Sequence, residues 1–200
     1  MTVNWFLTAA LVVACVALML IERRTGTRLV LTLRVKSDIK RETRFLAQYG
    51  QFACTAVAVL IVWSLGGSRW RNADAGVAVP LAAAPLAAGV LGALVKRLLG
   101  RVRPGHENAG RFMGVDLAHA NYRESFPSNH TACAVALTVG LAYLYPPAAW
   151  VFWLLAAACG LLRYLQDAHW PSDVAGGAAF GYLIAVGVWR GIYALGGHAM

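Results

Sequence analysis

Long stretches without charged side chains constrain this chain more than any other feature of its sequence. Between Ser125 and Leu162 it contains no Asp, Glu, Lys or Arg. Of its 200 residues, 59% are hydrophobic and 14% are charged, whereas about a quarter of a typical soluble domain is charged. A soluble core of this size cannot bury so much apolar surface. The sequence therefore predicts an integral membrane protein.

Six apolar segments are interpreted as membrane-spanning helices because of their length and composition. They lie near residues 3–21, 50–65, 76–95, 129–145, 148–165 and 174–193. The first is read as a retained span, since no basic segment precedes it as in a signal peptide. The third contains Pro80 and Pro85, which spanning helices tolerate. We expect one all-α domain over residues 1–200, built as a membrane-embedded helix bundle.

Two long connections carry most of the positive charge. Residues 22–49 contain eight basic side chains interleaved with apolar ones, a pattern typical of amphipathic helices in the membrane interface. Residues 96–127 are polar and contain six more. With six spans, both connections fall on one membrane face. The net charge of +9 thus favours anionic membrane lipids as partners rather than nucleic acid.

Small side chains inside the apolar segments are interpreted as packing residues. Gly176, Gly177 and Gly181 are predicted to let the last segment pack closely on a neighbouring helix. The four cysteines form neither a zinc pattern nor a disulfide framework: Cys15, Cys54, Cys133 and Cys159.

Three polar groups border the apolar segments at that same face. They run from Lys96 to Pro104, from Phe126 to Thr131 and from Arg163 to Asp173. Charged groups next to hydrocarbon are costly and usually functional. We therefore expect the three groups to converge in one pocket.

The basic side chains in these groups indicate an anionic ligand. Lys96, Arg103 and Arg163 offer many hydrogen-bond donors and no acceptor, which suits a phosphate dianion. The dipeptide Pro127–Ser128 predicts a helix start with Ser128 as the N-cap. The free N–H groups of that first turn attract an anion as well.

Two histidines and an aspartate indicate the chemistry. His169 and Asp173 are four residues apart, so the carboxylate is predicted to fix the tautomer of the imidazole. The other ring nitrogen of His169 is then free to attack phosphorus. His130, in the first turn of the predicted helix, is the natural general acid for the leaving oxygen.

These groups resemble the motifs of the type 2 phosphatidic acid phosphatase (PAP2) superfamily of membrane lipid phosphatases. Its first pattern, K-x6-R-P, is matched by Lys96 and Arg103–Pro104. Its second, P-S-G-H, is matched by residues 127–130, except that Asn129 replaces glycine.

The third pattern of the superfamily, S-R-x5-H-x3-D, is matched by Arg163, His169 and Asp173, with Leu162 in place of serine. The six-span layout agrees as well, so the resemblance covers most of the chain. It implies an all-α fold of the PAP2/haloperoxidase type.

The resemblance also implies roles for individual residues. His169 would form a phosphohistidine with the assistance of Asp173, and His130 would protonate the leaving group. Five residues would hold the phosphate: Lys96, Arg103, Ser128, Asn129 (through its backbone N–H) and Arg163. The superfamily needs no metal or other cofactor.

Other polar and aromatic residues near the segment ends are interpreted as structural rather than catalytic. Arg97 and Arg101 are expected to anchor the interface by contacting lipid headgroups. Arg163 and Asp167 are expected to form an i,i+4 ion pair. Several aromatic side chains are assigned to interfacial belts: Trp70, Trp150, Tyr164 and Trp170.

The sequence therefore predicts a metal-independent lipid phosphatase that acts on a phosphomonoester or a diphosphate. The resemblance suggests phosphatidate, phosphatidylglycerophosphate or a polyprenyl diphosphate as substrate. Two alternatives stay open: a lipid or sugar phosphotransferase that uses the same site, and a non-enzymatic transporter or anion-binding scaffold. A permeation path predicts charges spread across mid-depth, whereas here they gather at one face.

The distribution of basic residues predicts which face of a bacterial inner membrane carries the site. Fifteen Lys and Arg lie on the motif-bearing face and three on the other. By the positive-inside rule that face is cytoplasmic, although many bacterial members of the superfamily work on the outer leaflet. A Ser37→Cys variant without native cysteines should resist a membrane-impermeant thiol reagent in intact cells. Labelling before permeabilisation would place the site outside.

Overall fold

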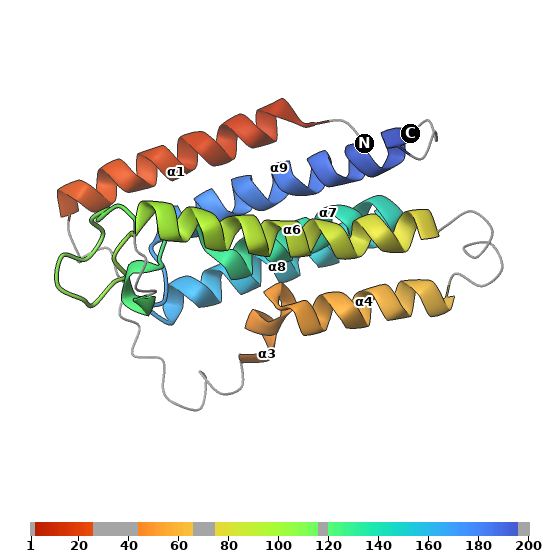
Figure 1. Ribbon diagram of the computed structural model, residues 1–200, viewed down its shortest axis with the longest axis horizontal. Coiled ribbons are helices and arrows are strands. Elements are labelled where there is room, and N and C mark those ends of the chain that lie inside the picture. Colours follow the sequence, from red (N-terminus) through yellow and green to blue (C-terminus); the bar gives the residue numbers. More distant parts are fainter. Residues whose placement is uncertain (1–2, 26–43, 66–74, 116–119, 196–200) are drawn as a thin grey trace.

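The computed structural model describes residues 3–25, 44–65, 75–115 and 120–195 (Figure 1). Helices account for the regular structure in these ranges, which confirms the all-α prediction. The longer ones are α1 (Trp5–Thr25), α4 (Phe52–Leu65), α6 (Ala75–Leu99), α7 (Asn129–Leu144), α8 (Ala149–Leu165) and α9 (Pro171–Leu195). Short helical turns complete the set: α3 (Arg44–Ala47), η2 (Gln48–Gly50), η3 (Asn121–Arg123) and η4 (Pro146–Ala148).

Each of the six predicted apolar segments forms a helix. Within the described ranges, four helices are long and apolar enough to cross a membrane: Trp5–Thr25, Val77–Leu99, Pro146–Leu165 and Pro171–Leu195. Helices α4 and α7 are shorter, with 14 and 16 residues. The chain is an integral membrane protein.

Two helices extend beyond their predicted ends for local reasons. Helix α6 continues through Lys96 and Arg97 to Leu99, where positive charge complements the negative end of the helix dipole. Helix α9 begins at Pro171, three residues earlier than predicted. Proline suits the first helical position because no N–H is needed there.

Large apolar side chains cover the outside of the bundle. Phe6 is 90% exposed, and Trp63, Leu154 and Trp150 on other helices are also exposed. An exposed apolar surface this extensive marks contact with lipid rather than water. An interfacial belt requires exposed aromatic side chains, and Trp150 is exposed; Trp70, assigned to the same belts, lies outside the described residues.

Helix α7 forms the centre of the bundle. Its residues from Thr131 to Leu141 are all buried, and it packs against α6, α8 and α9 (Figure 1). Helices α6, α8 and α9 therefore surround it, while α1 packs on α9 and α4 packs on α6. This explains why a helix of only 16 residues determines the positions of its neighbours.

The close contact between α7 and α9 depends on glycine, as predicted. A Cβ added to Gly177 would lie 2.6 Å from the carbonyl oxygen of Ser128. A Cβ at Gly181 would overlap the carbonyl oxygen of Ala132. The two backbones therefore touch directly, and the first turn of α7 lies against the first turns of α9.

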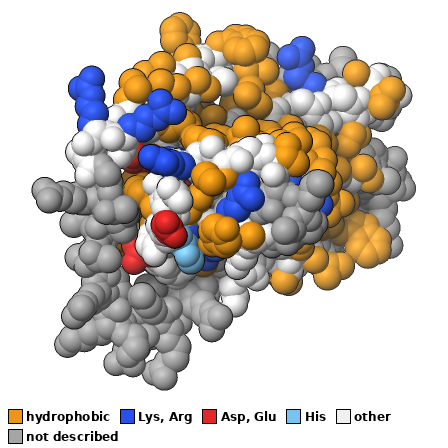
Figure 2. Space-filling model, turned by 60° about the vertical axis from the view of Figure 1, so that its left-hand side comes forward, with side chains coloured by type: hydrophobic (Ala, Val, Ile, Leu, Met, Phe, Trp, Pro, Cys, Tyr) orange, Lys and Arg blue, Asp and Glu red, His pale blue; other side chains and the backbone are white. Residues whose placement is uncertain are grey.

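The polar connections gather at one end of the bundle. Helices α1, α6 and α8 end there, and α7 and α9 begin there (left in Figure 1). Figure 2 shows basic side chains on this end, next to the apolar flank of the bundle. Most of the expected interfacial helices fall within residues 26–43, outside the described residues. Of the rest, residues 22–25 form the end of α1, and residues 44–49 lie in α3 and η2.

The α7–α9 contact yields a stability prediction. Gly181→Ala should lower the free energy of unfolding by about 1–3 kcal/mol, because the added methyl group overpacks a backbone contact. Gly187 lies on the same helix with open space around its Cα, so Gly187→Ala serves as the matched control. Thermal unfolding in detergent, followed by tryptophan fluorescence, measures both variants. Equal stability of the two would contradict the packing account.

Candidate active site

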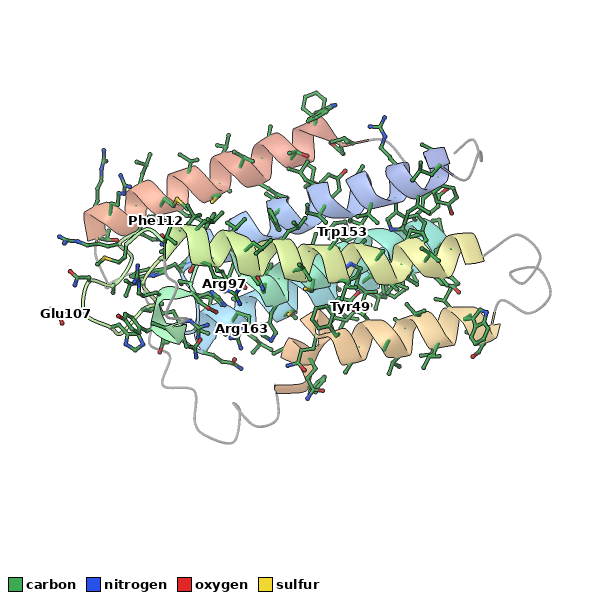
Figure 3. All side chains as sticks on the ribbon, viewed as in Figure 1. Tyr49, Arg97, Glu107, Phe112, Trp153 and Arg163 are labelled. Atoms are coloured by element: carbon green, nitrogen blue, oxygen red, sulfur yellow. The ribbon has the colours of Figure 1, made fainter. Side chains whose placement is uncertain are left out.

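Residues of all three motifs lie at the polar end of the bundle. Lys96 is in the last turn of α6, His130 in the first turn of α7 and Arg163 in the last turn of α8. Figure 3 shows Arg163 at the same end as Arg97. His169 precedes α9, and Asp173 lies in its first turn. The helix ends thus bring together groups that are far apart in sequence.

The imidazole of His169 is held by a backbone carbonyl. Its Nδ1 lies 2.8 Å from the carbonyl oxygen of Ser125 and 3.7 Å from Oδ2 of Asp173. Because a carbonyl oxygen only accepts, Nδ1 carries the proton and Nε2 holds the lone pair. We predicted that Asp173 fixes this tautomer. The direct acceptor is Ser125, while Asp173 lies at ion-pair distance.

Asp173 joins the three motifs. Its carboxylate accepts hydrogen bonds from Arg101 Nη1 at 2.5 Å, from the backbone N–H of Trp170 at 2.8 Å, and from the hydroxyl of Ser125. Its own carbonyl oxygen accepts from the backbone N–H of Ser128 at 3.0 Å. The side chain is fully buried, so these donors replace water as its solvation.

The environment of His169 favours its neutral form. Burial lowers the pKa of the imidazole to about 4, and the nearby charges of Lys96 and Arg163 act in the same direction. The interaction with Asp173 opposes this shift. At neutral pH the Nε2 lone pair is therefore available, as a nucleophile requires.

Cationic groups surround His130 and His169. Lys96, Arg103 and Arg163 are all close enough to His130 to interact electrostatically with it. The Nε atoms of Arg103 and Arg163 are buried and have no hydrogen-bond partner among the described residues. The ammonium group of Lys96 donates to the carbonyl oxygen of Glu124 at 2.6 Å. This arrangement concentrates donors for an anion.

The expected ion pair between Arg163 and Asp167 does not form. Arg163 Nη1 donates instead to Oε1 of Gln166 at 3.2 Å. Helix α8 ends at Leu165, and Asp167 has a φ of 55°. The i,i+4 geometry of a helix is therefore lost before Asp167.

The start of α7 is packed against α6 and α9. Ser128 is the N-cap residue, as predicted, but its side chain makes no capping bond and accepts from Thr131 at 3.0 Å. The side-chain amide of Asn129 donates to the carbonyl oxygen of Gly89 at 3.2 Å. A Cβ at Gly92 would overlap Oδ1 of Asn129. Gly92 in α6 thus leaves space for the side chain of Asn129, which stands where the superfamily has glycine.

A mostly apolar groove opens beside His130. It has a volume of about 600 Å³ and lies between α4, α6 and α7. Phe52, Val90 and Cys133 contribute its apolar walls, while Asn129 and His130 lie at its polar part. The shape and lining suit a hydrocarbon chain whose polar group reaches His130.

Two residues that were predicted to lie at the membrane interface are instead buried next to Asp173. Arg101, expected at the lipid interface, is 2% exposed and pairs with Glu22 and Asp173. Trp170, expected in an aromatic belt, is also 2% exposed and donates from Nε1 to the carbonyl oxygen of Val102 at 3.0 Å. Both predictions are wrong because the loop after α6 folds back over the start of α9.

Sequence reasoning did not identify Ser125 or Glu22 as part of the centre. Ser125 has no motif signal, since it acts through its backbone carbonyl group and through a hydroxyl bond to Asp173 that only the fold creates. Glu22 is the one acidic residue in α1. Its position directly after an apolar stretch is the feature of the sequence that could have indicated its role. The four cysteines are free, and the described residues contain no group of three or more His, Cys, Asp or Glu that could hold a metal ion.

Comparisons with known proteins agree with this geometry. The profile of the PAP2 superfamily matches residues 77–196, which include all three motifs. The chain therefore belongs to the PAP2 superfamily. No solved structure gives a significant match.

Three curated proteins are similar to parts of the chain. Lipid A 1-phosphatases from Rhizobium johnstonii and Rhizobium etli are 38% and 40% identical over 94 and 95 residues, each match covering 46% of this chain. These matches span 38% and 40% of the relatives' own lengths. The bacitracin transport permease protein BcrC of Bacillus licheniformis is 36% identical over 62 residues, 31% of this chain and 30% of its own.

The burial of His169 predicts the pH range over which its imidazole stays neutral. In the absence of ligand, the imidazole should stay neutral from pH 8 down to about pH 5, because its pKa is near 4 rather than 6.5. NMR of 13C-labelled histidine in micelles, with His169→Gln to assign the signal, measures this directly. A midpoint for His169 above pH 6 would contradict the described environment.

Proposed function

We propose that the protein is a membrane lipid phosphatase that hydrolyses a lipid phosphomonoester or diphosphate. The observation that carries this proposal is the His169 imidazole: Nδ1 is bonded to the Ser125 carbonyl group, and Nε2 is free among cationic side chains. Membership of the PAP2 superfamily supports it. The described helices would act as one catalytic domain.

In the first step, Nε2 of His169 attacks phosphorus, and the bond between phosphorus and the leaving oxygen breaks. His130, protonated while the anionic substrate is bound, transfers its proton to that oxygen. The phosphoryl group is then bonded to His169, and the Nδ1 proton stays between Ser125 and Asp173. In the second step, His130 takes a proton from water as the water attacks phosphorus, and inorganic phosphate leaves with His169 regenerated.

Five groups would hold the phosphate through both steps. The side chains of Lys96, Arg103 and Arg163 would neutralise its charge. The hydroxyl of Ser128 and the backbone N–H of Asn129 would donate to it at the positive end of α7, since the backbone N–H of Ser128 already bonds to Asp173. These charges perform the task that a metal ion performs in many other phosphatases. The reaction should therefore proceed without a metal or other cofactor.

The substrate would be a lipid of the membrane that surrounds the bundle. The apolar groove beside His130 is the natural place for its hydrocarbon chain. Phosphatidate, phosphatidylglycerophosphate and polyprenyl diphosphates are candidates by family. The names of the two Rhizobium relatives add the 1-phosphate of lipid A. We propose a bacterial inner membrane as the location, with the site on the cytoplasmic face.

Phosphate release tests the proposal. His169→Ala should lower the rate by about 10³-fold or more, since no other group at that position forms the covalent intermediate. The assay presents this panel of lipid phosphates to purified protein in detergent with EDTA, and His106→Ala is the matched control. Undiminished activity of His169→Ala, or turnover that requires a divalent metal, would contradict the mechanism. Phosphate transferred to an added lipid or sugar would indicate the transferase instead.

A further inference from the structure

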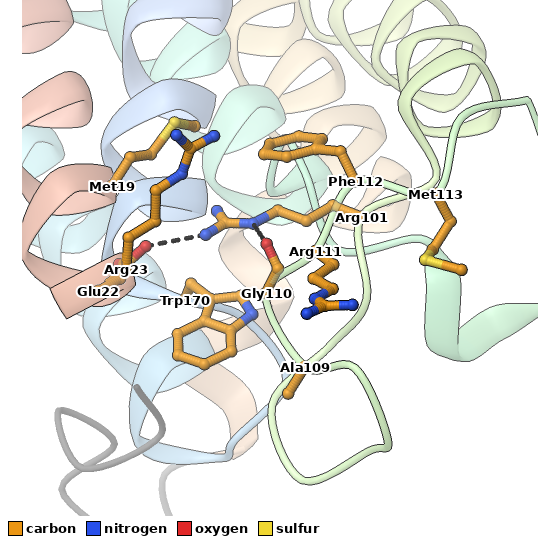
Figure 4. Close-up of a pocket in the computed structure, with 10 residues that line it drawn as sticks. All are labelled: Met19, Glu22, Arg23, Arg101, Ala109, Gly110, Arg111, Phe112, Met113 and Trp170. Carbon is orange, nitrogen blue, oxygen red and sulfur yellow. Dashed lines mark hydrogen bonds and ion pairs between the residues drawn. The ribbon is translucent and has the colours of Figure 1, made fainter. Parts of the chain in front are cut away.

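Arg101 connects the first helix to the catalytic centre. Its Nη2 donates to Oε2 of Glu22 at 2.9 Å (Figure 4). Its Nη1 donates to Oδ1 of Asp173 at 2.5 Å. The guanidinium group lies near the rings of Phe112 and Trp170, 5.2 and 5.6 Å from their centroids. The side chain is therefore held on several sides and has little freedom to leave Asp173.

Glu22 completes this arrangement from α1. Its carboxylate accepts from the backbone N–H of Ser172 at 2.9 Å and from the Ser172 hydroxyl at 2.5 Å, in addition to Arg101. The Ser172 hydroxyl also accepts from Arg101 Nη1 at 2.7 Å. Glu22 is 5% exposed. Because each group has several partners, the geometry of the first turn of α9 depends on α1.

The charges of Glu22, Arg101 and Asp173 explain why Asp173 depends on both Glu22 and Arg101. Two buried carboxylates, Glu22 and Asp173, share the single guanidinium group of Arg101, so the trio carries one net negative charge. A buried carboxylate that lost this partner would be strongly disfavoured in its ionised form. Arg101 therefore keeps Asp173 ionised and in place, and Glu22 keeps Arg101 in place.

We propose that Glu22 and Arg101 are positioning residues for the catalytic pair His169 and Asp173. This inference rests on the proposed phosphatase function. Helix α1 lies outside the 77–196 region that the PAP2 profile matches, so the catalytic centre extends beyond that region. A cavity of about 630 Å³ borders the trio on the side of Arg23 and Arg111, and neither of those arginines bonds to Asp173.

Other charged or titratable groups also face the pair and must stay constant in a test. Toward His169 they are Lys96 from α6, His130 from α7 and Arg163 from α8. Toward Asp173 they are Arg103 from the loop and Cys15 from α1. Neutral substitutions at Glu22 and Arg101 change none of these groups, so a shift in the pH profile reports on the trio alone.

Three variants test the inference with short-chain phosphatidate in detergent micelles: Glu22→Gln, Arg101→Gln and the double variant. Each single substitution should lower kcat by about 10- to 100-fold, the loss typical when a hydrogen-bond partner of a metal-binding histidine is removed, with KM changed by about twofold or less. The double variant should recover part of the loss of Arg101→Gln, because it no longer leaves two carboxylates without a counter-charge.

The pH profile separates positioning from a merely structural role. Arg101→Gln makes the trio more negative, so the acid limb of kcat/KM should move to higher pH. Glu22→Gln should move it to lower pH, and the double variant should return it close to the wild-type position. Size-exclusion chromatography and thermal unfolding show whether each variant is folded. If Arg101→Gln does not fold, Glu22→Gln and the double variant carry the test.

Arg23→Gln is the matched control, since Arg23 is adjacent to Glu22, borders the same cavity and is exposed. Wild-type kcat in folded Glu22→Gln and Arg101→Gln would overturn the inference, as would a lower kcat with an unshifted pH profile and no recovery in the double variant. The proposed function is tested separately by His169→Ala in the same assay. Turnover by His169→Ala refutes the phosphatase mechanism, whereas its inactivity beside fully active Glu22 and Arg101 variants refutes only this inference.

Discussion

The buried carboxylate of Asp173 is the point on which the arrangement of the site depends. Its side chain accepts hydrogen bonds from Arg101 and Ser125, and its backbone carbonyl oxygen accepts one from Ser128. Arg101 lies in the loop after α6, Ser125 lies in the segment before α7, and Ser128 is the N-cap residue of α7. A single residue at the start of α9 thus holds together the surroundings of all three motifs, and His169 takes its orientation from the same cluster.

The membrane explains why this cluster lies at a helix end. Within hydrocarbon, backbone groups must be satisfied by helices, and polar side chains are costly. The chemistry is therefore confined to the end where α6 and α8 stop and α7 and α9 begin. Direct backbone contact at Gly177 and Gly181 fixes the distance between α7 and α9, so the positions of His130 and His169 relative to each other follow from helix packing.

Much of this organisation could be predicted from the sequence, because its signals are local. The apolar segments, the spacing from Lys96 to Arg103 and the interval from His169 to Asp173 are each visible in a short window. The contributions of Ser125, Arg101 and Glu22 could not be predicted in the same way. Ser125 acts through its backbone carbonyl group and through a hydroxyl bond to Asp173, neither of which a motif marks. Arg101 and Glu22 meet only because a loop folds back on α1, which no periodicity encodes.

The central claim is that His169 carries the phosphoryl group during turnover. Its most direct test is rapid alkaline quenching of the protein during reaction with a lipid phosphate, followed by mass spectrometry of its peptides. Phosphohistidine is stable in base and labile in acid, so the account predicts an acid-labile phosphoryl group on the peptide that contains His169. Continuing turnover with no phosphoryl group on His169, or with one on another residue, would contradict it.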